Sequence, residues 1–330
     1  MVAARWRGKR AQVSSMEERP SGLGLPELGW SEDAHALRLR LRALLDESAP
    51  LVLPGVTDVL GMRLVERAGF PAAYATGAGL ANAQHGLPDI GLVSSAEVVD
   101  HVGSLTSGSG IPLVVDADTG FGGPLTAMRT VRRLERAGAA AIQLEDQEMP
   151  KRCGHFDGHA LIPREHMQTK IAAALEARSD DALALIARTD ARSVHDIDEA
   201  IARAHAYVEA GADVIFVEAP RTVDELARVG RELAGVPLVV NVVEGGRTPE
   251  LELKEYADLG FSLVLFANFL MRSMMAAGAE ALAHLRRHGE TASRASRMVS
   301  WEQRQELFHL RQFSEAEALL DRPWGAGGSA

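Results

Sequence analysis

The 330-residue sequence is poor in cysteine, aromatic residues and positive charge, and it has no long hydrophobic run. The single cysteine, Cys153, cannot form an internal disulfide framework, and no apolar stretch reaches the about 18–20 residues that span a bilayer. We therefore expect a cytoplasmic protein with no membrane partner. The 45 acidic residues outnumber 35 Lys and Arg, and the net charge of −10 argues against a nucleic-acid surface. Local cations or a metal would have to hold any anionic ligand, because the overall field repels it.

The first thirty residues differ in composition from the rest of the chain. Residues 1–10 are basic and no acid occurs before Glu17, while Pro and Gly recur between positions 20 and 26. We interpret residues 1–30 as a disordered leader; a transit peptide, or a true start at Met16, are the other interpretations. The whole sequence is 46% hydrophobic, which is enough to bury a sizeable core, and we predict a single domain over residues 31–330.

From residue 51 onward, short apolar runs alternate with amphipathic helical stretches. Eight strands are predicted, at 51–56, 72–76, 112–116, 141–145, 184–188, 214–218, 237–241 and 262–266. Helices are predicted between and after them, at 58–68, 96–106, 125–137, 163–177, 197–210, 223–233 and 250–259. Eight buried strands alternating with helices indicate an α/β fold of the (β/α)8, TIM-barrel type. An open doubly wound sheet is the alternative, but no G-x-G-x-x-G turn follows the first strand.

Two further helical regions, at 269–285 and 301–320, follow the last predicted strand. The second one carries Phe308, Leu310, Phe313, Leu319 and Leu320. These apolar side chains need another surface to pack against. We therefore expect this segment to dock on the barrel or on a neighbouring subunit.

The connection between the fourth strand and the next helix, residues 147–162, is unusually long. Long connections in compact domains are commonly functional lids, and we favour a lid here. Lys151 and Arg152 precede Cys153, and Gly154 and His155 follow it. Nearby cations and an imidazole favour the thiolate or ease proton delivery, whereas an inert, buried cysteine is the alternative.

Polar residues end nearly every predicted strand. They are Thr76, Gly77, Asp116, Asp118, Glu145, Asp146, Arg188, Asp190, Glu218, Asn241 and Glu244. Barrel enzymes build their sites at these strand ends, although single acids there can instead cap helices.

Three of these acids, Asp116, Asp118 and Glu145, form the strongest group. Residues two apart on an extended segment point the same way, so both aspartates can face one spot that Glu145 can join. Clustered carboxylates favour a cation, and oxygen ligands suit Mg²⁺ or Mn²⁺. Asp89 is either an outer partner of this metal or a turn residue. Arg188 is either a clamp for a substrate carboxylate or a structural counter-ion.

Several strings together resemble the isocitrate lyase/phosphoenolpyruvate mutase superfamily, over about residues 45–320. They are "AAYATGAGLANAQHGLPDIGL" (72–92), "VDADTGFGG" (115–123), "QLEDQ" (143–147), "KRCGH" (151–155), "IARTDAR" (186–192), "FVEAP" (216–220) and "NVVEGGRTP" (241–249). The resemblance implies an α/β barrel that exchanges its C-terminal helix with a neighbour in a homotetramer.

The same resemblance implies a role for each site residue. It assigns Mg²⁺ to Asp116, Asp118 and Glu145 with Asp89 nearby, and substrate carboxylate to the backbone amides of Thr76, Gly77 and Ala78. Arg188, Glu218 and Asn241 complete the pocket. The loop bearing Lys151, Arg152, Cys153, Gly154 and His155 closes over the substrate, and its thiol protonates the departing carbanion. Tyr74 assists at the substrate hydroxyl.

The activity that the resemblance favours is Mg²⁺-dependent carbon–carbon cleavage of a 2-methylisocitrate-like 2-hydroxy acid, giving a 2-oxo acid and a dicarboxylate. Two departures from the lyases keep alternatives open. Thr76-Gly77-Ala78 replaces Ser-Gly-Gly, and residues 243–246, Val-Glu-Gly-Gly, replace Thr-Glu-Phe-Gly and lack its aromatic wall. Strings 151–158 (Lys-Arg-Cys-Gly-His-x-x-Gly) and 243–249 (Val-Glu-Gly-Gly-x-Thr-Pro) are also similar to carboxyvinyl-carboxyphosphonate phosphorylmutase, which acts on a phosphonate. An oxaloacetate decarboxylase or hydrolase and a non-catalytic binding paralogue are the remaining alternatives.

Overall fold

The computed structural model describes residues 28, 33–152, 158 and 160–321. The described chain divides into two compact units, one that reaches to Met274 and one that begins at Met275. The predicted single domain over 31–330 stays a prediction, and each unit is considered by itself below.

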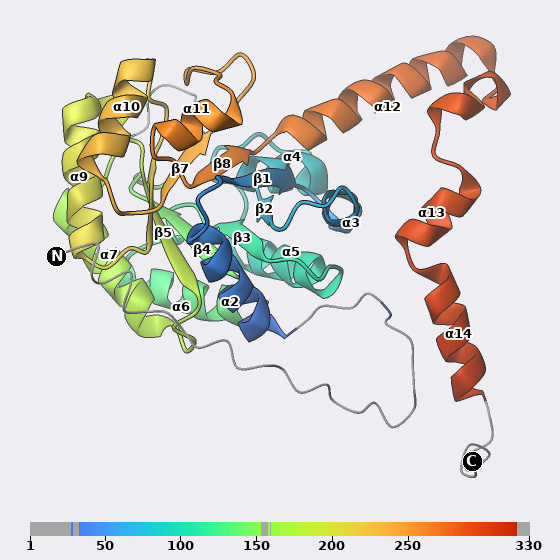
Figure 1. Cartoon of the computed structure of the whole chain (residues 1–330), viewed down its shortest axis with the longest axis horizontal. Coiled ribbons are helices and arrows are strands. Elements are labelled where there is room, and N and C mark those ends of the chain that lie inside the picture. The colour runs from blue at the N-terminus through green and yellow to red at the C-terminus, as the bar shows by residue number, and fades with distance from the viewer. Residues whose placement is uncertain (1–27, 29–32, 153–157, 159, 322–330) are drawn as a thin grey trace. The chain divides into compact units, whose positions relative to one another are not determined.

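The first unit is a closed barrel of eight parallel strands in chain order, in which β1 also pairs with β8 (Figure 1). The strands are β1 (Leu51–Val56), β2 (Ala73–Ala75), β3 (Leu113–Asp116), β4 (Ala141–Glu145), β5 (Ala184–Thr189), β6 (Val214–Val217), β7 (Leu238–Asn241) and β8 (Leu263–Phe266). Every predicted strand is present, and each end lies within one residue of its predicted position. The predicted (β/α)8 barrel is confirmed.

Helices surround the barrel, and those predicted between strands are all present. They are α3 (Val59–Arg67), α5 (Ser95–Ser107), α6 (Pro124–Arg136), α7 (Arg164–Ala177), α9 (Ile197–Glu209), α10 (Val223–Glu232) and α11 (Leu253–Asp258). Three more helices were not predicted: α2 (Ala34–Leu45), α4 (Gly77–His85) and α8 (Ala191–Val194). No helix of the described ranges is long and apolar enough to cross a membrane.

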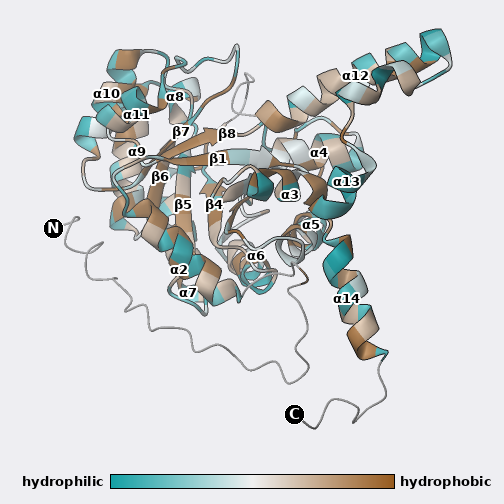
Figure 2. Ribbon diagram, turned by 45° about the vertical axis from the view of Figure 1, so that its right-hand side comes forward, coloured by the Kyte–Doolittle hydropathy of each residue, from teal (hydrophilic) through white to brown (hydrophobic). Residues whose placement is uncertain are grey.

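Side chains alternate along each strand between the barrel interior and the layer of helices. On β4, Ile142 and Leu144 belong to the core that packs against the helices, whereas Ala141 belongs to the interior core. Figure 2 shows the strands mostly in brown, the colour of hydrophobic residues. Leu41 and Leu45 of α2 join the interior core. This alternation decides which strand-end residues face the inside of the barrel.

The secondary structure of the second unit is helical in the residues that the structure describes. This unit holds most of α12 (Phe269–His288), the 3-10 turn η1 (Ala292–Arg297), α13 (Trp301–Leu307) and α14 (Leu310–Leu320). The region predicted as helical over 301–320 breaks at His309, whose φ of 55° lies in the left-handed region. Within α12, α13 and α14, Ala316 is the one side chain of the described residues that is buried.

Candidate active site

Strand register brings polar side chains together at the carboxyl end of the barrel. Asp116 of β3 is paired in register with Gln143 of β4, and Glu145 of β4 with Arg188 of β5. These residues share the inward side of their strands with Ala141, Val114 and Ile186, which belong to the interior core. The inward side therefore changes from apolar to charged at the end of each strand, as expected for a barrel enzyme.

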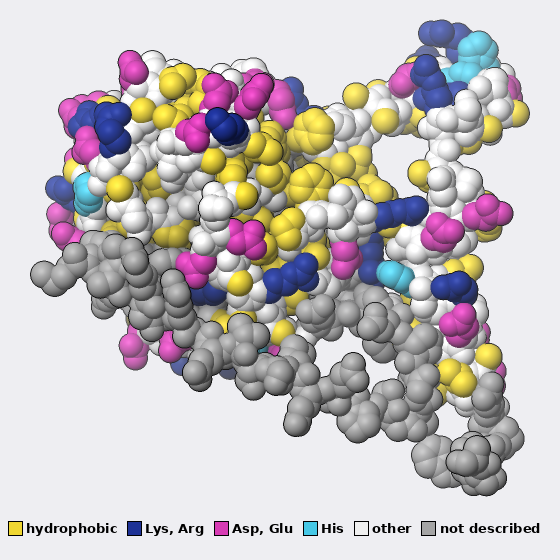
Figure 3. All heavy atoms as spheres, viewed as in Figure 1, with side chains coloured by type: hydrophobic (Ala, Val, Ile, Leu, Met, Phe, Trp, Pro, Cys, Tyr) yellow, Lys and Arg dark blue, Asp and Glu magenta, His cyan; other side chains and the backbone are white. Residues whose placement is uncertain are grey.

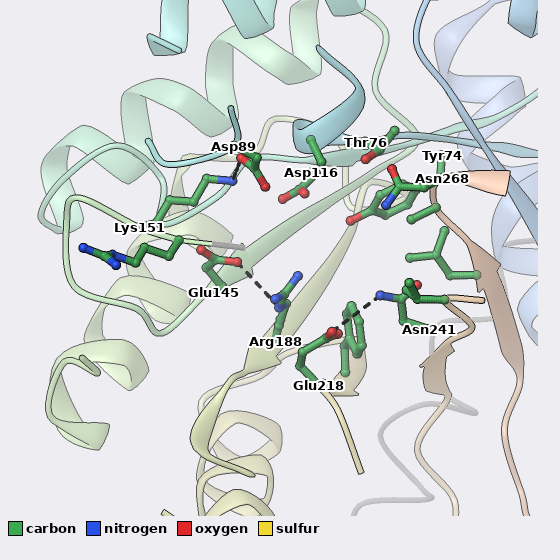
Figure 4. A pocket seen from close by; sticks show the side chains of 16 residues that line it. Tyr74, Thr76, Asp89, Asp116, Glu145, Lys151, Arg188, Glu218, Asn241 and Asn268 are labelled. Carbon is green, nitrogen blue, oxygen red and sulfur yellow. Dashed lines mark hydrogen bonds and ion pairs between the residues drawn. The ribbon is translucent and has the colours of Figure 1, made fainter. Parts of the chain in front are cut away.

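A pocket with a volume of about 490 Å³, counting its open mouth, lies over these strand ends (Figure 4). Its lining includes most of the predicted site: Tyr74, Thr76, Ala78, Asp89, Asp116, Glu145, Lys151, Arg152, Arg188, Glu218 and Asn241. Gly77 and Asp118 line a smaller adjoining hollow together with Asp89 and Lys151. Cys153, Gly154 and His155 lie outside the described residues.

Lys151 forms an ion pair with two of the predicted metal-binding acids. Its ammonium group contacts Asp89 and lies 2.7 Å from Asp118 Oδ1. The lysine is only 4% exposed. Burial alone lowers the pKa of Lys151, but Asp118 and Asp89 raise it well above its ordinary value, so the side chain stays charged. Asp89 thus pairs directly with Lys151, and its predicted place beside a metal stays a prediction.

Two carboxylates at the site, Asp118 and Glu145, are destabilised in their charged form. Burial raises the pKa of Asp118 to about 7; Asp116 and Asp89 add to this shift, and Lys151 opposes it. Burial also raises the pKa of Glu145 well above its ordinary value, although Arg188 opposes the shift. Additional positive charge at this position would lower the pKa of both carboxyl groups and stabilise their charged forms.

The oxygen atoms that the site offers fit a hard divalent cation. Among the described residues, no three His, Cys, Asp or Glu side chains converge closely enough to hold a metal ion. The ammonium of Lys151 pairs with Asp118 in this arrangement. However, Glu145 Oε1 is buried with no hydrogen-bond partner in the described part of the chain, and every acid nearby offers oxygen.

Arg188, near the end of β5, is held by an acid that follows the same strand. Its Nε and Nη2 donate to Asp190 Oδ2 and Oδ1 at 2.9 and 2.8 Å, and its Nε lies 3.6 Å from Glu145 Oε2. The guanidinium carbon lies 5.2 Å from the centre of the Phe216 ring. Burial lowers the pKa of Arg188, but Asp190, Glu218 and Glu145 raise it well above its ordinary value. The site thus contains a permanent, buried cation.

Tyr74 and Asp116 are linked through a residue that the sequence did not suggest. Tyr74 Oη donates to Gln143 Oε1 at 2.9 Å, and Gln143 Nε2 donates to Asp116 Oδ1 at 3.3 Å. Gln143 is buried on β4, two residues before Glu145. The two-residue strand period places both on the inward face, and that period is the signal that could have found Gln143.

The segment from Thr76 to Ala78 begins helix α4 instead of forming an open loop. Thr76 caps α4, its side chain accepting from the Gly79 amide, and the Gly77 amide donates to Asp116 Oδ2 at 3.3 Å. A Cβ atom at Gly77 would lie 3.1 Å from Asp116 Oδ2 and 3.2 Å from Asp118 Oδ1. Glycine therefore allows the helix N-terminus to approach the two carboxylates closely.

Glu218 and Asn241 lie together on the opposite side of the pocket from Lys151 (Figure 4). Asn241 Nδ2 donates to Glu218 Oε1 at 3.5 Å, whereas its Oδ1 is buried without a hydrogen-bond partner in the ranges described. Asn268, just after β8, also lines the pocket. Among the described residues, its Oδ1 is likewise buried without a hydrogen-bond partner. Asn268 was missed, although it is a polar residue following an apolar strand, as the predicted site residues are.

The described ends of the long β4–α7 connection are held together. Glu148 N donates to Ala160 O at 2.8 Å, and Ile162 N donates to Asp146 O at 2.9 Å. Arg152 N donates to Gln147 Oε1 at 2.9 Å. These bonds bring Lys151 and Arg152 to the pocket.

A barrel with buried acids, a buried arginine and a buried lysine at its carboxyl end is typical of enzymes that act on small anions. Residues 41–286 match the phosphoenolpyruvate phosphomutase family. The chain belongs to this family, within the isocitrate lyase/phosphoenolpyruvate mutase superfamily of lyases and mutases, as its motifs predicted.

Three relatives illustrate the range of activities in the family. A 2,3-dimethylmalate lyase of Eubacterium barkeri is 39% identical over 278 residues, covering 84% of this chain and 96% of that protein. A 2-methylisocitrate lyase of Bacillus subtilis is 38% identical over 280 residues, covering 85% and 91%. A chloroplastic carboxyvinyl-carboxyphosphonate phosphorylmutase of Arabidopsis thaliana is 37% identical over 286 residues, covering 86% and 84%.

Solved structures have the same fold. An oxaloacetate acetylhydrolase in complex with 3,3-difluorooxalacetate has a TM-score of 0.82 and 33% identity, covering 91% of this chain and 100% of that one. A phosphonopyruvate hydrolase complex with oxalate and Mg²⁺ has a TM-score of 0.78 and 32% identity, covering 85% and 98%.

Proposed function

We propose that this enzyme is a Mg²⁺-dependent carbon–carbon lyase. Its substrate would be a 2-hydroxy di- or tricarboxylate of the 2-methylisocitrate type, cleaved to a 2-oxo acid and a dicarboxylate. The observation that carries this proposal is the pocket in which the acids at the ends of β3 and β4 lie together with the buried cation Arg188. The similarity to two lyases of 2-hydroxy acids, over more than four fifths of the chain, supports it.

The acids and the cations would bind different parts of the substrate. Mg²⁺, held by Asp116, Asp118 and Glu145 with Asp89 nearby, would supply the charge that polarises the substrate's hydroxyl and carboxylate oxygens. Arg188 would bind a carboxylate through its remaining N–H groups, which can form paired hydrogen bonds. Glu218 and Asn241 would complete the pocket, and the α4 N-terminus (Thr76 to Ala78) would face the same anion.

Cleavage would leave an electron pair on the carbon next to the departing carboxylate. The hydroxyl gives its proton to one of the carboxylates that line the pocket and becomes the carbonyl of the 2-oxo acid as the carbon–carbon bond breaks. The new enolate-like dianion lies among Arg188, Lys151 and Arg152, which stabilise its charge. The thiol of Cys153 then protonates the carbon, with Gly154 and His155 completing its loop.

Two other reactions have specific support. The sequence strings 151–158 and 243–249, together with the Arabidopsis relative, favour carboxyvinyl-carboxyphosphonate phosphorylmutase-like chemistry on a phosphonate. The similarity to oxaloacetate acetylhydrolase favours cleavage of oxaloacetate. Both need an anion pocket beside a metal, so the arrangement of charges alone does not separate them from the lyase.

Product analysis separates the three reactions. The full-length enzyme with Mg²⁺ would be incubated separately with 2-methylisocitrate, a phosphonopyruvate-type substrate and oxaloacetate, and followed by ¹H and ³¹P NMR. We expect a 2-oxo acid and a dicarboxylate from 2-methylisocitrate, and no turnover after chelation by EDTA until Mg²⁺ is restored. An untouched 2-methylisocitrate sample beside rearranged phosphorus signals would establish the mutase instead, and full activity in EDTA would exclude the proposed metal.

We further propose a homotetramer with exchanged C-terminal helices, as the family resemblance implies. The exposed apolar side chains of the second unit support this proposal and are considered in the Discussion.

A further inference from the structure

We propose that Asp190 is a positioning residue that orients Arg188 toward the substrate, and that Asp146 holds Asp190 in place. The inference rests on the proposed function, because it assumes that Arg188 binds a substrate carboxylate. It adds a second layer of residues behind the pocket.

The first step concerns which N–H groups Arg188 has left to donate. Asp190 occupies Nε and one hydrogen of Nη2, at 2.9 and 2.8 Å, in a paired arrangement. Nη1 and the second hydrogen of Nη2 then remain for a ligand. Arg188 is 9% exposed and Asp190 is fully buried, so water competes little with this pair. Asp190 thereby selects the edge of the guanidinium that can meet a substrate.

The second step concerns the competitors of Asp190. Glu145 Oε2 lies only 3.6 Å from Arg188 Nε, and Glu218 also interacts electrostatically with the guanidinium. If the charge of Asp190 were lost, the guanidinium would turn toward these pocket acids. Such a turn would occupy the donors meant for the substrate.

The third step is that Asp190 is itself fixed from behind. Its backbone amide donates to Asp146 Oδ1 at 3.0 Å, and Thr189 Oγ1 donates to Asp146 Oδ2 at 2.7 Å. Tyr207 Oη and Arg203 Nη1, both from α9, donate to the same Oδ2 at 2.7 and 3.1 Å. Four donors on one fully buried carboxylate fix the turn after β5 rigidly.

Asp146 also connects this turn to the base of the long β4–α7 connection. Its backbone carbonyl accepts from Ile162 N, and Arg203 Nη1 donates to Ile162 O at 2.9 Å. The same buried residues thus position the arginine of the pocket and the segment from which the Cys153 loop extends. A carboxylate with so many donors far from solvent is better explained by positioning than by an isolated ion pair.

The test measures binding of oxalate to the full-length protein in saturating Mg²⁺ by calorimetry. We expect Asp190→Asn to weaken oxalate binding about tenfold, the effect of losing one charge-assisted hydrogen bond in a buried site. Asp190→Glu keeps the buried charge but displaces it by one methylene, and we expect a several-fold loss for it as well. If Asp190→Asn does not fold, the Asp190→Glu variant tests the same prediction.

A double-mutant cycle separates positioning from general structural support. Arg188→Lys keeps a charge but lacks the paired geometry, and we expect it to bind oxalate about tenfold more weakly than the native protein. In the Arg188→Lys background, Asp190→Asn should change the affinity less than twofold, because Asp190 acts through the guanidinium. A full tenfold further loss in that background would overturn the inference.

Asp213 provides the matched control. It is a buried aspartate that precedes β6, at the opposite end of the barrel, and it pairs with Arg42 and Arg178. Asp213→Asn should lower the melting temperature but leave oxalate affinity unchanged. If Arg188→Lys binds oxalate like the native protein, the clamp of the proposed function fails. If Arg188→Lys weakens binding but both Asp190 variants do not, only the positioning inference fails.

Discussion

Tyr74 illustrates how burial decides what a side chain at this site can do. Its hydroxyl lies inside the barrel, donating to Gln143, and burial raises its pKa well above the ordinary value, with Asp116 adding to the shift. A raised pKa extends the range over which the phenol stays neutral. Tyr74 is therefore a hydrogen-bond donor at neutral and moderately alkaline pH, and we expect it to assist at the substrate hydroxyl in its neutral form.

For Tyr74→Phe, we predict an unchanged alkaline limb in the pH profile of kcat/KM. The rate itself should fall by about tenfold at most, since one hydrogen bond is lost. Stability should fall by about 1–3 kcal/mol, because Gln143 Oε1 loses its donor in a buried place. Rate profiles from pH 6 to 10 and urea denaturation measure both; an alkaline limb that disappears in the variant would contradict this role.

For Cys153→Ser, we predict loss of turnover with retained ligand binding. A serine hydroxyl is a much weaker acid than a thiol, so protonation of the carbanion should slow by about 100-fold or more. Oxalate affinity in Mg²⁺ should stay within about twofold, since the variant leaves the acids and Arg188 intact. The two measurements use the same preparation, and turnover near the native rate would remove the thiol from its proposed step.

At this scale the sequence predicted which residues gather, but not how each one is held. The argument for Asp116 and Asp118 assumed an extended segment, which is wrong: β3 ends at Asp116, and Asp118 has a φ of 47°. Both aspartates still reach the site, because Asp118 N turns back to donate to Asp116 Oδ1 at 3.1 Å. The position of Lys151 beside Asp118 depends on a folded connection, which no local pattern reveals.

Among the elements, the strands were predictable from the sequence, whereas helices α2 and α4 were not. Buried parallel strands give continuous apolar runs, which a single sequence shows clearly. Helix α4 contains Gly77, Gly79 and Asn82, which are poor helix formers, and it depends on its Thr76 cap and on Gly86 in the left-handed conformation. Such a helix is defined by its ends and its neighbours, so periodicity did not find it.

Helix α2 is joined to the barrel by charged contacts as well as by its leucines. Arg38 Nη1 and His35 Nδ1 lie 2.8 and 2.9 Å from Asp180 Oδ2, and Arg38 also donates to the carbonyls of Glu135 and Ala139. Burial raises the pKa of Asp180, but the hydrogen bonds from Arg38 and His35 outweigh it, so the net shift is downward.

For Asp180→Asn, we predict a pH-dependent loss of stability. A lowered folded-state pKa gives stability that is present above the unfolded value of about 3.9 and disappears as pH falls through the folded value. The variant should therefore melt below the native protein at pH 7, and the difference should shrink below about pH 4. Asp181→Asn is the control, because that side chain is 98% exposed and its change should matter little. A difference that is constant with pH would contradict the assignment.

The whole molecule combines a net negative charge with a pocket that holds three cations among its acids. The net charge of −10 repels anions at a distance, whereas Arg188, Lys151 and Arg152 attract them locally. Within the barrel unit, the acids at the strand ends hold these cations in the pocket. The face in Figure 3 accordingly shows acidic and basic side chains interspersed over that unit.

The helical unit is the part of the molecule whose stability needs explanation. Helices of 7 and 11 residues, such as α13 and α14, are marginal by themselves in water. Yet Leu282, Val299 and Trp301 are 68%, 72% and 70% exposed, and Phe308 and Leu320 are exposed as well. Figure 3 shows yellow side chains along α12, which has no buried residue. Monomeric proteins rarely leave so much apolar surface uncovered, so we infer that a second copy of the chain covers it.

For Trp301→Glu, we therefore predict loss of assembly. Light scattering after size exclusion should give four copies of the 35.4 kDa chain for the native protein and a smaller particle for the variant, because a buried unpaired carboxylate destabilises an apolar interface. Leu125→Glu is the matched control: Leu125 is 82% exposed on α6 of the barrel, and its charge should leave the mass unchanged. A monomeric native protein at micromolar concentration would show instead that these helices need no second copy, and the exchange of C-terminal helices would have to be abandoned with the tetramer.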